Sequence, residues 1–280
     1  MSNVRKAKHG WVLTLIFSLI SIAYIMPIVI VLMNSFKRKI FISNRPFALP
    51  DAKSFVKIEN YINGIQKTDF FRAFGYTLFI TVGSVFVIVL CTSMCAWYIS
   101  RVKSKWTTGI YYLFAFSMIV PFQMVMFTLS KIADMLHLGN PVGIIIVYLG
   151  FGAGLAVFMF CGFVRSIPLE IEESAMIDGC NPVQTYFKIV FPIMKPTAIS
   201  VAILETMWVW NDYLLPYLVL KINKYKTIQI AIQYLKGGYG AIDMGAMMAM
   251  IVLAIIPIIL FYGFCQKYII EGVISGAVKG

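Results

Sequence analysis

The sequence has few charged residues for its length. Lysine, arginine, aspartate and glutamate make up 13% of the 280 residues, whereas about a quarter of a typical soluble domain is charged. Hydrophobic residues make up 60%, which is more apolar surface than a water-facing fold of this size buries. The composition therefore excludes a soluble globular domain and indicates an integral membrane protein.

The residues of metal and nucleotide sites are also scarce. His9 and His137 are the two histidines, and the sequence has neither an HExxH motif nor a Walker A motif, which gives no support to a zinc hydrolase or a self-contained ATPase. The five cysteines form no CxxC pair, and we interpret them as small apolar side chains. We therefore expect this chain to bind no metal or cofactor itself.

The net charge of +12 does not indicate nucleic-acid binding. The sequence has no run of five or six basic residues, and the lysines and arginines are spread between apolar stretches. Basic residues commonly flank membrane spans in this way.

Six apolar stretches are long enough to cross a bilayer, which takes roughly 20 helical residues. They cover approximately residues 11–33, 71–100, 108–130, 142–164, 193–219 and 241–265. The first stretch is longer than the core of a signal peptide, and we expect it to be retained. The sequence thus predicts an all-α membrane protein with six transmembrane helices.

Basic residues at the start of the chain favour one orientation. Arg5, Lys6 and Lys8 precede the first span and indicate a cytoplasmic N-terminus at residues 1–10. Six spans then place the C-terminal tail, residues 266–280, in the cytoplasm as well. The loop at 34–70 is expected outside, although its own lysines and arginines weaken the charge bias.

One polar stretch interrupts the apolar pattern in the middle of the chain. The sequence "RSIPLEIEESAMIDGCNP" contains four acids, a glycine and two prolines. Ser166 suits a helix N-cap and Pro168 a first turn, Gly179 suits a C-terminal stop, and Asn181 before a proline suits a new N-cap. The resulting helix of roughly ten residues is too short to span a membrane. It is either a connector or a docking surface, and the residues alone leave both open.

The spacing in and after this short helix resembles the signature loop of ABC-transporter importer permeases. The family pattern is Glu-Ala-Ala, three residues, Gly, nine residues, Ile, one residue, Leu-Pro. This sequence has Ser174 at the first alanine position and Phe191 at the leucine position. Further segments, "LGNPVGIIIVYLGFGAG", "WVWNDYLLP" and "GVISGAVKG", are similar to the carbohydrate importers, notably to the second membrane subunit of the maltose system.

The resemblance implies a MetI-like permease core of five helices at 71–265, with a coupling loop at 166–192. In that family the short helix docks on a cytoplasmic ATPase and passes its movement to the membrane helices. The last residues of the chain would also reach the ATPase, unless they form a frayed terminus. The coupling residues expected by match to the motif are Glu173, Ser174, Ala175, Ile177, Asp178, Gly179, Ile189 and Pro192, and those of the tail are Gly276, Lys279 and Gly280.

The resemblance also implies partners. They are a second homologous permease that forms a heterodimer with this chain, two ATPase subunits that hold ATP and Mg, and an extracytoplasmic solute-binding protein. The chain would carry out no catalysis and would lie in a bacterial-type cytoplasmic membrane. A sugar or oligosaccharide is the expected substrate, with glycerol phosphate or a polyamine as alternatives, and a non-transport scaffold as an alternative of another class.

Glu205 is an acid inside an apolar stretch. A carboxylate in lipid costs roughly 2.5 kcal/mol or more, so it should face a cavity or a partner. Trp208 and Asp212 share its helical face and Asn211 lies beside it. An aromatic plane with acid and amide groups suits a sugar, and Gln123 is a second candidate. Polar contact with the sister subunit is the alternative, since in maltose-type systems the other subunit makes most substrate contacts.

Overall fold

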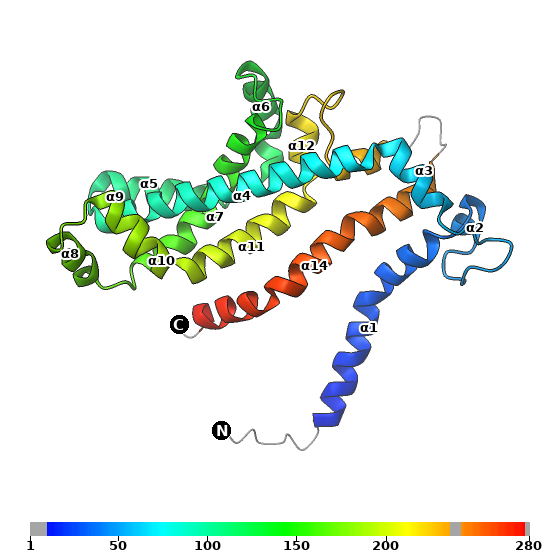
Figure 1. Cartoon of the computed structure of the whole chain (residues 1–280), viewed down its shortest axis with the longest axis horizontal. Coiled ribbons are helices and arrows are strands. Elements are labelled where there is room, and N and C mark those ends of the chain that lie inside the picture. Colours follow the sequence, from blue (N-terminus) through cyan, green and yellow to red (C-terminus); the bar gives the residue numbers. More distant parts are fainter. Residues whose placement is uncertain (1–9, 236–241, 278–280) are drawn as a thin grey trace. The chain divides into compact units, whose positions relative to one another are not determined.

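The computed structural model describes residues 10–235 and 242–277, and side chains up to residue 268. This part of the chain is largely helical, and an antiparallel bridge joins Lys37 and Phe55. Figure 1 shows its elements: α1 (Gly10–Asn34), α2 (Lys39–Asn44), α3 (Glu59–Thr68), α4 (Phe70–Arg101), α5 (Lys105–Ser117), α6 (Phe122–Met135), α7 (Gly143–Val164), α8 (Leu169–Ile177), α9 (Pro182–Thr185), η1 (Tyr186–Val190), α10 (Phe191–Ile193), α11 (Lys195–Asn211), α12 (Leu214–Val219), α13 (Ile228–Gln233) and α14 (Met244–Ala277).

The long apolar helices agree with the predicted all-α membrane fold. In the described part of the chain, α1, α4, α7 and α14 are each long and apolar enough to cross a bilayer. Two bent pairs also qualify, one formed by α5 and α6 and the other by the segment from α9 to α10 together with α11. Counting each pair as one span gives up to six, which matches the number of predicted stretches.

Two of the predicted stretches are not continuous helices. The 108–130 stretch bends by 107° between α5 and α6, because Pro121 is extended at the start of α6 and proline cannot continue the preceding helix. The 193–219 stretch ends its long helix at Asn211, because Asp212 is extended and its Oδ1 accepts hydrogen bonds from the backbone N–H groups of Leu214 and Leu215. These bonds start α12.

The chain forms two compact units that divide α14 between them. The first contains residues 1–70 and 232–256, and the second contains 71–231 and 257–280. Within the first unit, the Asn60 side chain donates to the carbonyls of Ser35 and Lys37 at 2.8 and 2.9 Å, and Lys67 pairs with Asp243 at 2.5 Å. The predicted core at 71–265 remains a prediction, and its residues 232–256 belong to the first unit.

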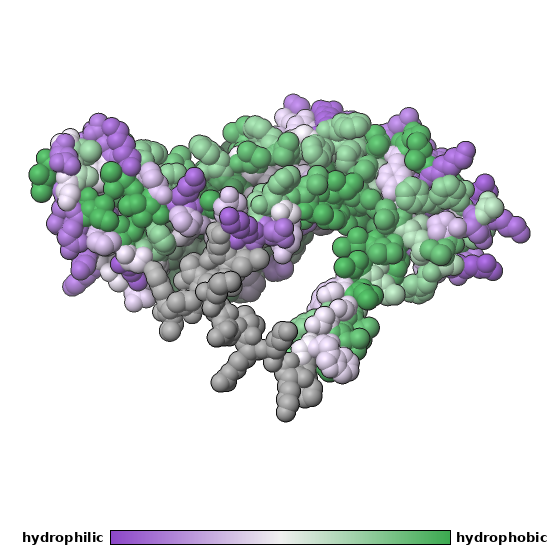
Figure 2. All heavy atoms as spheres, turned by 60° about the horizontal axis from the view of Figure 1, so that its bottom comes forward, coloured by the Kyte–Doolittle hydropathy of each residue, from purple (hydrophilic) through white to green (hydrophobic). Residues whose placement is uncertain are grey.

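The second unit contains the buried core that positions the candidate site. Ile88 on α4, Phe160 and Cys161 on α7, and Val201 on α11 are all buried in it. Small residues on α7 let neighbouring helices approach closely, as expected where helices pack in lipid. Figure 2 shows one face of the molecule, where hydrophobic residues cover much of the surface. Hydrophilic residues gather on this face around the end that carries α8.

Candidate functional site

The polar stretch folds as the short helix α8 followed by a sharp turn. Gly179 has φ of +87°, a left-handed conformation that favours glycine, and its N–H bonds to the Met176 carbonyl at 3.0 Å. The predicted glycine stop is therefore confirmed. The predicted Ser166 cap is wrong, since its hydroxyl donates back to the Phe163 carbonyl at 2.7 Å and Pro168 occupies the N-cap position of α8.

After the turn, a capping box restarts the helix as the sequence predicts. Asn181 Oδ1 accepts from the Gln184 N–H at 2.9 Å, and Gln184 Oε1 accepts from the Asn181 N–H at 3.0 Å. The π-helical segment η1 follows at once, and such segments are frequent at functional sites. The chain then bends by 75° as it enters α11.

Helix α8 has an attached side and a free side. Glu172 and Ala175 are buried in the second unit. Ile177 is 85% exposed, and Leu169, Ile171 and Met176 of the same short helix are exposed as well. Of the other predicted coupling residues, Ile189 is half-buried, and the exposed ones are Glu173, Ser174, Asp178, Gly179 and Pro192.

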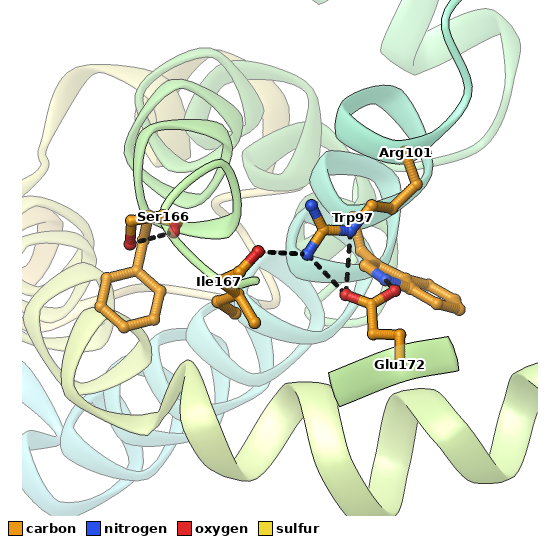
Figure 3. Close-up of polar contacts among 6 residues, drawn as sticks. Trp97, Arg101, Ser166, Ile167 and Glu172 are labelled. Atoms are coloured by element: carbon orange, nitrogen blue, oxygen red, sulfur yellow. Dashed lines mark hydrogen bonds and ion pairs between the residues drawn. The ribbon is translucent and has the colours of Figure 1, made fainter. Parts of the chain in front are cut away.

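Glu172 attaches α8 to the last turns of α4, and Figure 3 shows these contacts. Its Oε2 accepts from Trp97 Nε1 at 2.9 Å. Its Oε1 accepts from Arg101 Nε and Nη2 at 2.9 and 2.6 Å. The same Nη2 donates to the Ile167 carbonyl at 3.0 Å, so one guanidinium binds both α8 and the segment before it. The two side chains are 2% and 19% exposed, and such charge-assisted bonds are strong where water is excluded.

The π-helical segment η1 is also attached to α4, at a residue that precedes Trp97 and Arg101. Tyr186 is 1% exposed, and its hydroxyl shares a hydrogen bond of 2.7 Å with Ser93 Oγ. Its ring lies 5.5 Å from that of Trp97, centre to centre. Ser93, Trp97 and Arg101 are spaced by four residues and so lie on one face of α4. We call these three residues the α4 stripe.

Sequence reasoning missed the α4 stripe and the two residues that bind it, Glu172 and Tyr186. The sequence analysis counted Glu172 only as one of the four acids of the polar stretch. A signal was present, because Glu172 and Ala175 are three residues apart and share a helical face. The spacing of four along the α4 stripe was a second signal.

The structure brings three of the candidate pathway residues together against α7. Glu205 is 2% exposed, and a Cβ placed on Gly152 would lie 2.9 Å from its Oε2, which has no hydrogen-bond partner. The Trp208 ring stacks edge-on to Tyr148 at 5.4 Å between centroids, and the Tyr148 hydroxyl donates to Asp212 Oδ2 at 3.1 Å.

The two amide candidates do not join this cluster through any hydrogen bond in the described part of the chain. Asn211 is exposed, and its side-chain amide donates to the Met207 carbonyl of its own helix at 2.7 Å. Gln123 is exposed in the first turn of α6. In the predicted tail, Gly276 lies within α14, so this part of the tail continues a helix. Lys279 and Gly280 lie outside the described residues.

Comparison with known proteins places this geometry in a family. Residues 88–275, which include both the α4 stripe and the short helix, match the binding-protein-dependent transport system inner membrane components. The chain belongs to this family. It is therefore a transport permease subunit and a membrane protein, as the resemblance implied, and not an enzyme.

Two relatives of this permease align along almost their whole length. The probable starch degradation products transport system permease protein AmyC of Thermoanaerobacterium thermosulfurigenes is 36% identical over 96% of this chain and 97% of the relative. The multiple sugar-binding transport system permease protein MsmG of Streptococcus mutans is 32% identical over the full length of both.

A solved structure has the same fold. The crystal structure of a bacterial ABC transporter that imports the acidic polysaccharide alginate contains a chain that matches with a TM-score of 0.79. The alignment covers 96% of this permease and 99% of that chain, at 21% identity. The likeness confirms the predicted MetI-like permease fold.

Proposed function

We propose that this permease is one of two membrane subunits of an ATP-driven importer for sugars or oligosaccharides. A second homologous permease forms the heterodimer, and two cytoplasmic ATPase subunits hold ATP and Mg. An extracytoplasmic binding protein delivers the substrate. Both termini and α8 lie on the cytoplasmic side of a bacterial-type cell membrane.

The two-sided character of α8 is the observation that supports this coupling role. A helix that served only as a connector would need neither a buried attachment on one side nor an apolar residue left in water on the other. Here Glu172 is fixed among three donors, while Ile177 is 85% exposed. Together with the exposed Leu169, Ile171 and Met176, Ile177 gives this short helix an apolar surface that suits a protein partner.

The substrate class rests on the relatives. AmyC and MsmG carry names that refer to starch degradation products and multiple sugars, and both align with nearly all of this chain. Trp208 and Asp212 offer an aromatic face and a carboxylate of the kind that binds sugars. Because Tyr148 and two backbone N–H groups already occupy Asp212, Glu205 and Trp208 are the stronger candidates for a substrate path.

Affinity purification and uptake test the proposal together. The tagged permease is purified in mild detergent with the proteins that it retains, and the complex is reconstituted in liposomes with its binding protein. We expect ATP-dependent uptake of a maltooligosaccharide or a related sugar, but not of glycerol phosphate or spermidine. Uptake of one of these two solutes would reassign the substrate, and a chain recovered with no ATPase would favour the scaffold alternative.

A substitution at Ile177 tests the docking surface itself. Ile177→Asp should reduce the ATPase retained by the permease about tenfold, because a charge in an apolar contact costs more than about 1.4 kcal/mol. Ile177→Val is the matched control and should retain ATPase as the unchanged protein does. Equal retention in both variants would show that this surface does not bind the ATPase.

A further inference from the structure

The coupling loop has two routes into the membrane helices, and the covalent route is the less direct one. It runs from α8 through the turn at Gly179, the short α9, the π segment and a 75° bend before α11 begins. The second route is non-covalent and passes directly from α8 to α4. It consists of the hydrogen bonds between Glu172 and the α4 stripe.

Both carboxylate oxygens of Glu172 are held. Trp97 binds one and Arg101 binds the other, so the side chain cannot turn without losing several bonds at once. Burial strengthens this restraint, because a separated ion pair would leave a charge without water or a partner. Arg101 also binds the Ile167 carbonyl just before α8, so the restraint acts on the start of the helix as well as its middle.

A second part of the loop is attached to the same face of α4. Tyr186 binds Ser93 and packs on Trp97, at the other end of the α4 stripe from Arg101. Two attachments eight residues apart on one helix fix both the position and the direction of the loop. A single hydrogen bond would leave the loop able to pivot about α4.

We propose that Glu172 and Tyr186 lock the coupling loop to the α4 stripe, so that α4 moves with α8 and is a primary receiver of the force from the ATPase. The inference rests on the proposed function and adds a helix and positioning residues to it. Helix α4 has 32 residues and is therefore about 48 Å long, enough to carry the movement through the whole bilayer. Ile177 and the other exposed coupling residues of α8 contact the ATPase, and Glu172 passes the movement of the helix to α4.

Hydrogen exchange tests the lock without any partner. The full-length permease in lipid nanodiscs is compared with Glu172→Gln, which keeps the shape of the side chain and removes its charge. Amides of residues 169–177 should exchange about tenfold faster in the variant, because local opening no longer breaks an ion pair. Glu170→Gln is the matched control on the exposed side of the same turn and should leave exchange unchanged.

Tyr186→Phe tests the second attachment in the same assay. It removes the hydroxyl that binds Ser93 and keeps the ring that packs on Trp97. Exchange should rise in residues 182–190 and remain slow in 169–177. Equal exchange rates in the unchanged protein and all three variants would overturn the lock.

Transport measurements test whether the lock carries force. In the reconstituted complex, Glu172→Gln should retain its ATPase subunits and hydrolyse ATP within about twofold of the unchanged complex, while sugar moved per ATP falls about tenfold. A merely structural role would lower hydrolysis and uptake together through loss of assembly. Glu170→Gln should preserve the ratio of uptake to hydrolysis.

The unchanged complex separates this inference from the proposed function. If it shows no ATP-driven uptake, the proposed function is wrong and the inference falls with it. If it transports normally and Glu172→Gln transports equally well per ATP, the proposed function stands and the inference alone is wrong.

Discussion

Glu172 and Glu205 lie in the same unit and are equally buried, but they differ in the hydrogen-bond donors that surround them. Each is 2% exposed. Glu172 accepts three hydrogen bonds from Trp97 and Arg101, whereas Oε2 of Glu205 faces Gly152 with no donor. Burial alone therefore does not indicate what a carboxyl group does in this permease.

The difference in partners separates two kinds of role. A carboxylate with all its bonds satisfied inside the chain holds two helices together and has little capacity left for a ligand. A buried carboxyl oxygen without a donor costs free energy, and such groups in membrane helices are commonly functional. On this basis Glu172 holds α8 to α4, and Glu205 is available to a substrate or to the partner permease.

Substitution by methionine is expected to lower the free energy of unfolding much more at Glu172 than at Glu205. Glu172→Met keeps the length of the side chain and leaves the half-buried Arg101 without its counter-ion. Removing one partner of a buried pair costs about 3–5 kcal/mol, so the free energy of unfolding should fall by that amount. Denaturant titration of the purified permease in mixed micelles measures it, with Glu170→Met as the exposed control.

A second substitution should act through the space beside Glu205. Gly152→Val should lower the free energy of unfolding by about 1–3 kcal/mol, the usual cost of overpacking. A Cβ at this position would lie 2.7 Å from Ile88 Cδ1 and 2.9 Å from Glu205 Oε2. Gly150→Val is the control on the same helix, since nothing lies within 4 Å of a Cβ there. Equal stability of the two variants would mean that Ile88 and Glu205 can both move away freely.

The sequence predicted local structure better than it predicted long-range contacts. Gly179 and Asn181 were interpreted correctly because turns and caps depend on the residues next to them. Pro168 displaced the predicted Ser166 cap, which is a boundary error of two residues. The bend between α5 and α6 depends on one proline inside an apolar stretch, which hydropathy alone cannot detect.

The candidate site was predicted in part for the same reason. The free side of α8 follows from a motif that is continuous in sequence. The attachment of Glu172 joins residues more than 70 positions apart, and nothing in a single sequence pairs it with Arg101 or Trp97. The helical face of Glu205, Trp208 and Asp212 was predicted, but not its packing on Tyr148 and Gly152 of α7, which determines which of these acids is free.

The smallest effect on stability is expected at Glu205, whose carboxyl group makes the fewer hydrogen bonds of the two. Glu205→Met replaces a carboxyl group whose Oε2 has no donor with an apolar side chain of similar length, so the free energy of unfolding should stay within about 1 kcal/mol or rise. If Glu205 lines the substrate path, sugar uptake by the reconstituted complex should nevertheless fall, while retention of the ATPase stays unchanged. A loss of several kcal/mol would instead mean that Glu205 has a partner in the folded permease, and it would join Glu172 as a structural residue. Normal uptake with normal stability would remove Glu205 from the path and leave Trp208 as the remaining candidate on that face of α11.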